Sequence, residues 1–312
     1  MTLALTRFAP SPTGLLHLGH VYAADQVWRR ARELGASVLL RIEDTDFTRC
    51  RPDFDAAILD DLAWLGFEWT GPVVRQSTRK PLYEAAIERL KAAGLLYPCR
   101  CTRREIEAAW QGQPEYGPEG LRYPGTCKGL SQSQSQSENQ NQNQSLGDQP
   151  VAWRLDMAKA LAGVSALETP MLDGSSLDFL PLARATGDVV LVRKDIGSSY
   201  HLAVTVDDAL QQVTHVIRGE DMRDATAVHR VLQQVLDYPV PVYDFHALIL
   251  EDEGRKLSKR DGSEGLRVLR AQGLSAAEVL ALARQRASAT AGASASAAAG
   301  VTTVTGEGGD RV

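Results

Sequence analysis

Residues 3–46 read LALTRFAPSPTGLLHLGHVYAADQVWRRARELGASVLLRIEDTD, and this stretch decides the fold. An apolar strand over 3–9 ends at a proline, apolar side chains recur at helical spacing over 18–34, and a compact apolar strand follows at 37–42. Gly35, directly after the helical stretch, is typical of a helix C-terminus. The order strand, helix, strand predicts a parallel α/β sheet, which binds ligands at the carboxyl ends of its strands.

The α/β pattern continues beyond this stretch and is interrupted once. Residues 95–130 are rich in Cys, Gly and Pro, so we expect a small insertion there. Residues 131–149, SQSQSQSENQNQNQSLGDQ, predict a disordered loop because they cannot bury enough apolar surface to offset the entropy of ordering. After residue 286 the chain is rich in Ala, Ser, Gly and Thr, and we expect a disordered tail. The expected segments are 1–94 and 150–286 for the α/β domain, 95–130 for the insertion, 131–149 for the loop and 287–312 for the tail. Further helices are expected at 53–65, 80–94 and near 222–236, and strands near 151–155, 188–194 and 213–218.

The composition is that of an ordinary globular protein. Hydrophobic residues make up 44% and charged residues 23% of the chain, and no apolar run approaches the roughly 20 residues that cross a bilayer. The N-terminus has no succession of basic, apolar and small residues of the secretory type. We therefore expect a cytoplasmic protein that does not span a membrane. The net charge of −5 means that any contact with RNA must come from a local basic patch.

Two histidines lie three residues apart at the start of the first predicted helix. His17 and His20 would lie on one side of a helix N-terminus, whose free N–H groups favour phosphate. Lys256 and Lys259, in the stretch KLSKR, could hold the β- and γ-phosphates of ATP. Each motif alone is weakly specific, because two incidental histidines or a solvated basic loop would give the same pattern. The pair within one α/β unit is far more specific than either motif.

HLGH (17–20) and KLSKR (256–260) resemble the HIGH and KMSKS motifs of class I aminoacyl-tRNA synthetases. RFAPSPTG (7–14), RIEDTD (41–46) and VIRGED (216–221) resemble the glutamyl/glutaminyl branch of that class in order and spacing. The resemblance implies a Rossmann-like parallel sheet with an inserted zinc-binding, acceptor-type subdomain. A leucine replaces the isoleucine of HIGH and the final serine of KMSKS is missing, but the imidazoles and lysines are present, so we expect activity.

The resemblance implies a role for each matching residue. Arg7 and Arg218 would bind the two carboxylates of glutamate, and Glu43 would bind its ammonium group. This charge set suits a dicarboxylate with one amine, because guanidinium groups fit carboxylates bidentately. The alternative is that Glu43 and Arg218 form only an ion pair at a strand end. The implied glutamate-binding residues are Arg7, Phe8, Ala9, Pro10, Ser11, Glu43, Tyr200 and Arg218; those for ATP are His17, Gly19, His20 and Lys259; and the catalytic residues are His17, His20, Lys256 and Lys259.

The cysteines favour a metal site over disulfides. Cys99 and Cys101 are separated by one residue, a spacing that favours metal ligation in a reducing compartment. Structural zinc prefers sulfur and nitrogen ligands, so chemistry alone would suggest a further Cys or His as the fourth ligand. The resemblance implies instead that Tyr123 completes a single structural Zn²⁺ site with Cys99, Cys101 and Cys127. The alternative is that Tyr123 is a packing aromatic that binds no metal. Cys50 lies outside the cluster in either case.

The implied reaction is attack of the glutamate α-carboxylate on the α-phosphate of ATP, with Mg²⁺ bound to the ATP. Only about 50 residues follow Lys259, where glutamate-charging synthetases carry an anticodon-reading domain. The chain therefore resembles a shortened branch of the family, which transfers glutamate to queuosine at the wobble position of tRNA(Asp). We expect a monomer that contacts this tRNA through arginines 100, 103, 104 and 122 near the cysteines.

Three other functions are compatible with parts of the sequence. A truncated synthetase could charge the 3′ end of tRNA(Glu), although the missing anticodon domain argues against it. A non-catalytic regulator would have no chemical need for the histidines, lysines and Glu43. Another class I nucleotidylyltransferase is disfavoured by RFAPSPTG together with RIEDTD.

Overall fold

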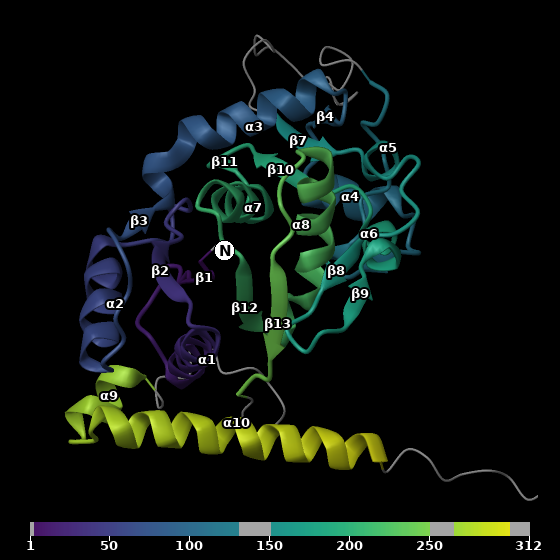
Figure 1. Ribbon diagram of the computed structural model, residues 1–312. Helices are drawn as coiled ribbons and strands as arrows, with labels where there is room; N and C mark the ends of the chain where they lie inside the picture. The colour runs from purple at the N-terminus through teal and green to yellow at the C-terminus, as the bar shows by residue number, and fades with distance from the viewer. Residues whose placement is uncertain (1–2, 131–150, 250–264, 300–312) are drawn as a thin grey trace, which may run out of the picture.

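The computed structural model describes residues 3–130, 151–249 and 265–299, with side chains as far as residue 290. Figure 1 shows two neighbouring layers of strands, one parallel and one antiparallel, with helices α7 (Tyr200–Leu210) and α8 (Arg223–Val235) between them. The loop expected at 131–149 and the lysines of KLSKR lie outside the described residues.

The parallel sheet is built from both halves of the chain. β2 (Ser37–Ile42) pairs in parallel with β1 (Leu5–Phe8) and with β3 (Val74–Arg75), and β12 (His215–Gly219) pairs in parallel with β13 (Val242–His246). The two groups meet where the backbone N–H of Thr214 donates to the carbonyl of Leu5 at 2.9 Å. The spatial order is therefore β3-β2-β1-β12-β13. The strand order reverses between β1 and β12, which is the position where open α/β sheets bind ligands.

Helix α1 (Leu18–Leu34) follows β1 and has the ends that the sequence predicts. The ring of His17 caps its N-terminus, and Gly35 closes its C-terminus in the left-handed conformation, with φ of 60°. Its buried face includes Leu18, Val21 and Ala24, at the helical spacing that predicted it. The predicted helices that flank the sheet are also present, as α2 (Pro52–Trp64), α3 (Lys80–Ala92) and α8.

The second sheet corrects the expected extent of the insertion. β4 (Leu96–Cys99), β7 (Ala152–Leu155), β10 (Val190–Arg193) and β11 (Gly197–Ser198) form an antiparallel sheet in the order β11-β10-β7-β4. The strands expected near 151–155 and 188–194 therefore exist, but they do not resume the parallel sheet. They pair with a strand from the cysteine-rich stretch because that pairing buries their apolar sides in a separate core.

Short elements fill the insertion and its connection to the parallel sheet. They are α4 (Arg103–Ala109), β5 (Tyr116–Gly117), β6 (Gly120–Leu121), α5 (Met157–Ala160), β8 (Glu168–Pro170), β9 (Ser176–Asp178) and α6 (Leu180–Thr186). Thr102 and Glu105 form a capping box that starts α4 within a stretch of little apolar periodicity.

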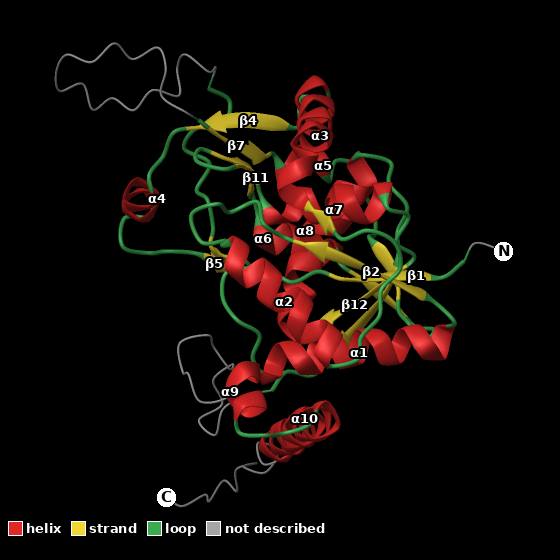
Figure 2. Cartoon of the chain, turned by 90° about the vertical axis from the view of Figure 1, so that its left-hand side faces the viewer, coloured by secondary structure: helices red, strands yellow, loops and turns green. Residues whose placement is uncertain are grey.

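The C-terminal helices cover the parallel sheet from below. α9 (Leu266–Ala271) and α10 (Ala276–Ala299) follow the undescribed residues 250–264, and Figure 2 shows α10 beneath α1. The segment expected to be disordered from residue 287 is helical as far as Ala299, because alanine has the highest helix propensity and Ala287 packs in the core. None of the described helices is long and apolar enough to cross a membrane.

Candidate active site

A cavity of about 700 Å³ lies at the carboxyl ends of β1 and β12. The strand order reverses at this place, so the loops after the two strands diverge and leave space between them. The cavity brings together the predicted residues that the structure describes, while Lys256 and Lys259 lie outside the described residues. Those that line it are Arg7, Phe8, Ala9, Pro10, Ser11, His17, Gly19, His20, Glu43, Tyr200 and Arg218.

The two histidines of HLGH have their tautomers set by the helix start. Nδ1 of His17 accepts the backbone N–H of Gly19 at 3.1 Å, and Nδ1 of His20 accepts the backbone N–H of His17 at 3.2 Å. A neutral imidazole that accepts at Nδ1 carries its proton on Nε2. Each ring therefore has one N–H donor at Nε2, and the ring centroids are 3.8 Å apart. Two donors beside a helix N-terminus suit a bound anion.

Arg7 is held in the cavity wall by a buried carboxylate. Its Nε lies 3.1 Å from Oδ1 of Asp208, and the same oxygen accepts a hydrogen bond from Nη1 of the fully buried Arg41 at 2.8 Å. The two guanidinium groups hold the pKa of Asp208 below its ordinary value despite its burial. Sequence reasoning gave Arg41 and Asp208 no role. The available signal was an arginine inside the apolar strand SVLLRI, because a charged side chain is almost never buried without a partner.

The neighbouring aspartate anchors this pair to α3. Asp207 is completely buried and accepts hydrogen bonds from Gln76 at 2.9 Å, Arg79 at 2.6 Å and Tyr83 at 2.8 Å. These bonds satisfy its carboxylate and fix the start of α3, together with the short 3-10 helix Gln76–Arg79 before it, against α7. The backbone that carries Asp208 is thereby held in place.

Glu43 follows β2 and lies against Arg41 at the back of the cavity. Its carboxylate is 3.6 Å from the guanidinium of Arg41, and only 9% of its side chain is exposed. Burial raises the pKa of Glu43 to about 7, and the nearby Arg41 and Arg7 limit the rise. Its ion-pair partner is thus Arg41 rather than Arg218. A cation in the cavity would stabilise the ionised form of Glu43.

Arg218 ends β12 and faces the cavity from the opposite wall. Its Nη1 donates to Nδ1 of His229 at 3.2 Å, its Nη2 donates to the hydroxyl of Thr226, and its guanidinium lies 5.4 Å from the ring centroid of Tyr243. Burial and the positive charge of Arg218 hold the pKa of His229 well below its ordinary value, so this imidazole is neutral.

Tyr200, the first residue of α7, completes the polar lining. A tyrosine phenol keeps its proton at neutral pH, so the hydroxyl of Tyr200 is a hydrogen-bond donor. The lining of the cavity thus includes the guanidinium groups of Arg7 and Arg218, the carboxyl of Glu43 and the phenol of Tyr200. This set is complementary to a small dicarboxylate that carries an amine.

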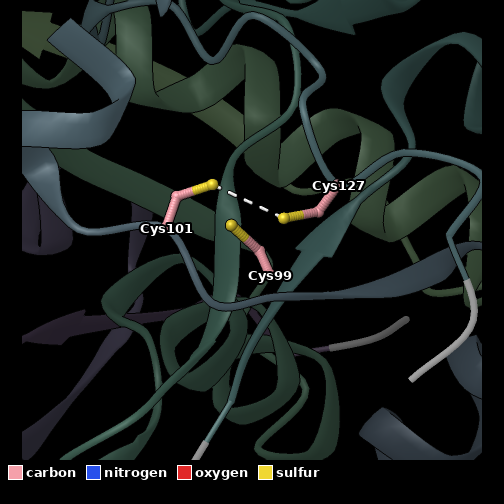
Figure 3. Close-up of side chains that lie close together, drawn as sticks. All are labelled: Cys99, Cys101 and Cys127. Carbon is pink, nitrogen blue, oxygen red and sulfur yellow. Dashed lines mark hydrogen bonds between the residues drawn. The ribbon is translucent and has the colours of Figure 1, made fainter. Parts of the chain in front are cut away.

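The three cysteines of the insertion converge on one point, as Figure 3 shows. The Sγ atoms of Cys99, Cys101 and Cys127 lie within 4.8 Å of one another, and Cys101 and Cys127 are 3.4 Å apart. The hydroxyl of Tyr123 lies 3.4 Å from Sγ of both Cys99 and Cys101. Thiolates around one tetrahedral zinc ion stand about 3.8 Å apart, so these spacings fit such an ion.

Arg154 and the backbone hold Tyr123 in this position. The guanidinium carbon of Arg154 lies 3.8 Å from the ring centroid, and the backbone N–H of Cys127 donates to the tyrosine hydroxyl at 2.8 Å. The hydroxyl of Tyr123 is therefore directed among the three sulfur atoms. The described residues around the cluster contribute no histidine.

Residues 4–305 match the family of class I tRNA synthetases (E and Q), catalytic domain. A protein of Rhodobacter capsulatus, named glutamyl-Q tRNA(Asp) synthetase, is 46% identical over 281 residues, which are 89% of this chain and 99% of the relative. A protein of the same name from Nocardia farcinica is 42% identical over 88% of this chain and 82% of its own length.

Solved structures show the same architecture. A glutamate-tRNA synthetase from Elizabethkingia anophelis is 28% identical and aligns with a TM-score of 0.62 over 83% of this chain. A glutamate tRNA ligase from Elizabethkingia meningosepticum, in complex with its amino acid, aligns with a TM-score of 0.61, also at 28% identity over 83% of this chain. The chain spans about half the length of these two proteins, 53% and 52%.

Proposed function

Because the chain belongs to the catalytic-domain family of class I tRNA synthetases for glutamate and glutamine, we propose that it activates L-glutamate with ATP and transfers the glutamyl group to queuosine in tRNA(Asp). The observation that carries this proposal is the charge set of the cavity, in which Arg7 and Arg218 face Glu43. Two relatives at 42% and 46% identity carry the name of that activity and support the choice of acceptor.

In this proposal the substrate glutamate is held at three points. Arg218 binds one carboxylate and Arg7 the other, while the ionised Glu43 binds the ammonium group. Tyr200 donates a hydrogen bond to the amino acid. Arg7 uses its Nε on Asp208, so the partner fixes the plane of the guanidinium before the substrate arrives.

The first chemical step joins glutamate to AMP. An oxygen of the α-carboxylate attacks the α-phosphorus of ATP, and pyrophosphate leaves with the electrons of the broken P–O bond. His17 and His20 donate from Nε2 to the oxygens where negative charge develops, beside the N-terminus of α1. Lys256 and Lys259 are proposed to bind the terminal phosphates. Mg²⁺ on the ATP would neutralise phosphate charge when bound.

The second step transfers the glutamyl group to the RNA. A hydroxyl of queuosine attacks the activated carbonyl carbon, and AMP leaves as the C–O bond to it breaks. No side chain of the protein forms a covalent intermediate in either of the two steps. The proposed RNA contacts are the arginines of the insertion, of which Arg103 has an exposed side chain and Arg122 is half-exposed. We place this reaction in the cytoplasm, catalysed by a monomer.

One structural Zn²⁺ ion is proposed at Cys99, Cys101, Tyr123 and Cys127. The support is the convergence of three thiols and one hydroxyl in a buried pocket of the insertion. The ion would link β4 to the segment from Tyr123 to Cys127 and thereby stabilise the insertion. It has no place in either chemical step.

The test is the transfer of labelled glutamate to purified tRNA in the presence of ATP. We expect label on tRNA(Asp) that contains queuosine and none on tRNA(Asp) that lacks it. Label on tRNA(Glu) instead would favour the alternative of a synthetase that charges the 3′ end without an anticodon domain. Label on none of the three, together with no glutamate-dependent exchange of pyrophosphate into ATP, would refute the proposed activity.

A further inference from the structure

A line of hydrogen bonds leads from the cavity into the insertion. It begins at Arg218, whose Nη1 lies 3.2 Å from Nδ1 of His229. It continues to His201, whose Nδ1 lies 3.2 Å from Nε2 of His229. It ends at Glu119, whose Oε2 lies 3.4 Å from Nε2 of His201. Glu119 lies between β5 and β6, in the hairpin of the insertion, so the line joins the two parts of the fold.

The direction of the bonds in this line is set from both ends, by Arg218 and by Glu119. Guanidinium nitrogens only donate, so Nδ1 of His229 must accept from Arg218, and the proton of this neutral imidazole lies on Nε2. Nε2 of His229 then donates to Nδ1 of His201, which leaves the proton of His201 on Nε2. That proton points to the Glu119 carboxylate, which can only accept. The hydrogen bond with His201 lowers the pKa of Glu119.

Removing the acceptor at the end would release this order. Without Glu119, His201 can carry its proton on Nδ1, where it would meet the Nε2–H of His229. One way to relieve that clash moves the proton of His229 to Nδ1, where it would face the N–H of Arg218, donor against donor. Arg218 would lose one of the partners that fix its plane and would keep its hydrogen bond to Thr226.

The position of Glu119 is fixed by a close backbone approach. A Cβ atom on Gly117 would lie 2.5 Å from the carbonyl oxygen of Ala185, at the end of α6. Only glycine permits this contact, which seats the hairpin against α6. The hairpin is also closed by the backbone N–H of Arg122, which donates to the carbonyl of Glu115 at 2.9 Å.

We propose that Glu119 is a positioning residue, which through His201 and His229 orients Arg218 for a substrate carboxylate, so that recognition of the amino acid depends on the seating of the insertion hairpin. This inference rests on the proposed function in one respect, that Arg218 binds a carboxylate of glutamate. It adds a dependence of the amino-acid site on a segment of the proposed RNA-binding insertion.

The kinetic test compares variants in glutamate-dependent exchange of pyrophosphate into ATP. We expect Glu119→Ala to raise the KM for glutamate about five- to tenfold, with the KM for ATP unchanged. Glu119→Gln keeps an acceptor oxygen and should stay within about twofold of wild type. Glu115→Ala removes a carboxylate from the same hairpin, whose partner is Arg122, and is the matched control. An unchanged KM in Glu119→Ala, or an equal rise in Glu115→Ala, would overturn the inference.

A second variant tests the seating of the hairpin. Gly117→Ala keeps the carboxylate of Glu119 but introduces the clash with the Ala185 carbonyl, which displaces the hairpin. It should therefore raise the KM for glutamate in the same way as Glu119→Ala. If it leaves that KM at the wild-type value while remaining folded, the coupling through the hairpin is wrong.

The proton positions can be measured without any variant or activity. Nitrogen-15 NMR of the six histidines distinguishes the two neutral tautomers, and we expect His229 and His201 to carry their protons on Nε2. A proton on Nδ1 of His229 would overturn the inference even in an active enzyme. Conversely, the expected tautomers in a protein without glutamate-dependent exchange would support the hydrogen-bonded line and refute the proposed function.

Discussion

Replacing Glu43 with glutamine separates the stability of the fold from the function of the cavity. The carboxyl group is buried beside Arg41, and its pKa is raised from the ordinary 4.5 to about 7. That rise of about 2.5 corresponds to about 3 kcal/mol, at about 1.4 kcal/mol for each pKa unit. The folded protein therefore carries this cost whenever Glu43 is ionised. The amide of glutamine has a similar shape and no ionisation.

The sign of the effect defines the pH window. Because the folded state binds this proton more tightly than the unfolded state, the contribution of Glu43 to stability is fully present below about pH 4.5 and is lost as the pH rises to about 7. Glu43→Gln should thus gain up to about 3 kcal/mol over wild type between pH 4.5 and pH 8. Titrations of groups that do not interact with Glu43 cancel in the difference between the two proteins.

Urea denaturation of both proteins at pH 5 and pH 8 measures this difference directly. Glu84→Gln, which removes an exposed carboxyl from α3, controls for the loss of one charge. Glu43→Gln should also bind glutamate about 30- to 100-fold more weakly, because the ammonium group of the substrate loses a charged partner. An equal stability difference at both pH values would refute the buried ionisation of Glu43. Unchanged glutamate affinity would refute its role in binding the substrate.

Three further substitutions test other parts of the structure. Arg284→Ala leaves the buried Asp25 carboxylate without its bidentate partner on α10, at 2.6 and 2.8 Å, and should lower the free energy of unfolding by about 2–3 kcal/mol in urea; an unchanged transition midpoint would contradict this. Cys101→Ser should lower the zinc content of purified protein, measured by atomic absorption, from one ion per chain to well below one, whereas full retention of zinc would exclude Cys101 as a ligand. Trp28→Phe removes the 2.5 Å bond from Nε1 to the carbonyl of Glu68 and should cost about 1–2 kcal/mol in thermal unfolding; a stability equal to wild type would show that water replaces the bond.

Local patterns determined the first strand, helix and strand and most of the elements that flank them. The apolar positions of 18–34 repeat at helical spacing, His17 and Gly35 close the ends, and the following strand is short and apolar. These signals act between residues that are close in sequence, so they do not depend on the rest of the fold. The cluster Cys99, Cys101 and Cys127 could also be predicted, because thiol side chains themselves indicate metal binding.

The tertiary structure alone decided which strands pair. β4 and β7 are separated in sequence by residues 100–151, yet they pair in antiparallel register with Leu96 opposite Leu155. A strand pattern states which side chains are apolar but does not identify the neighbouring strand, because pairing depends on the total surface buried. The resumed α/β pattern therefore led us to place 151–155 in the parallel sheet, although this strand pairs with β4.

The polar networks around the cavity are also a product of distant contacts. Arg41 meets Asp208 across 167 positions of the chain, and Glu119 meets His201 between the insertion and α7. Residue types and motifs indicated which groups could bind glutamate and ATP, because those groups carry the chemistry themselves. The groups that orient them carry no such signature. Their role arises only when folding removes water around them and leaves each buried charge or proton with only the partners that the fold supplies.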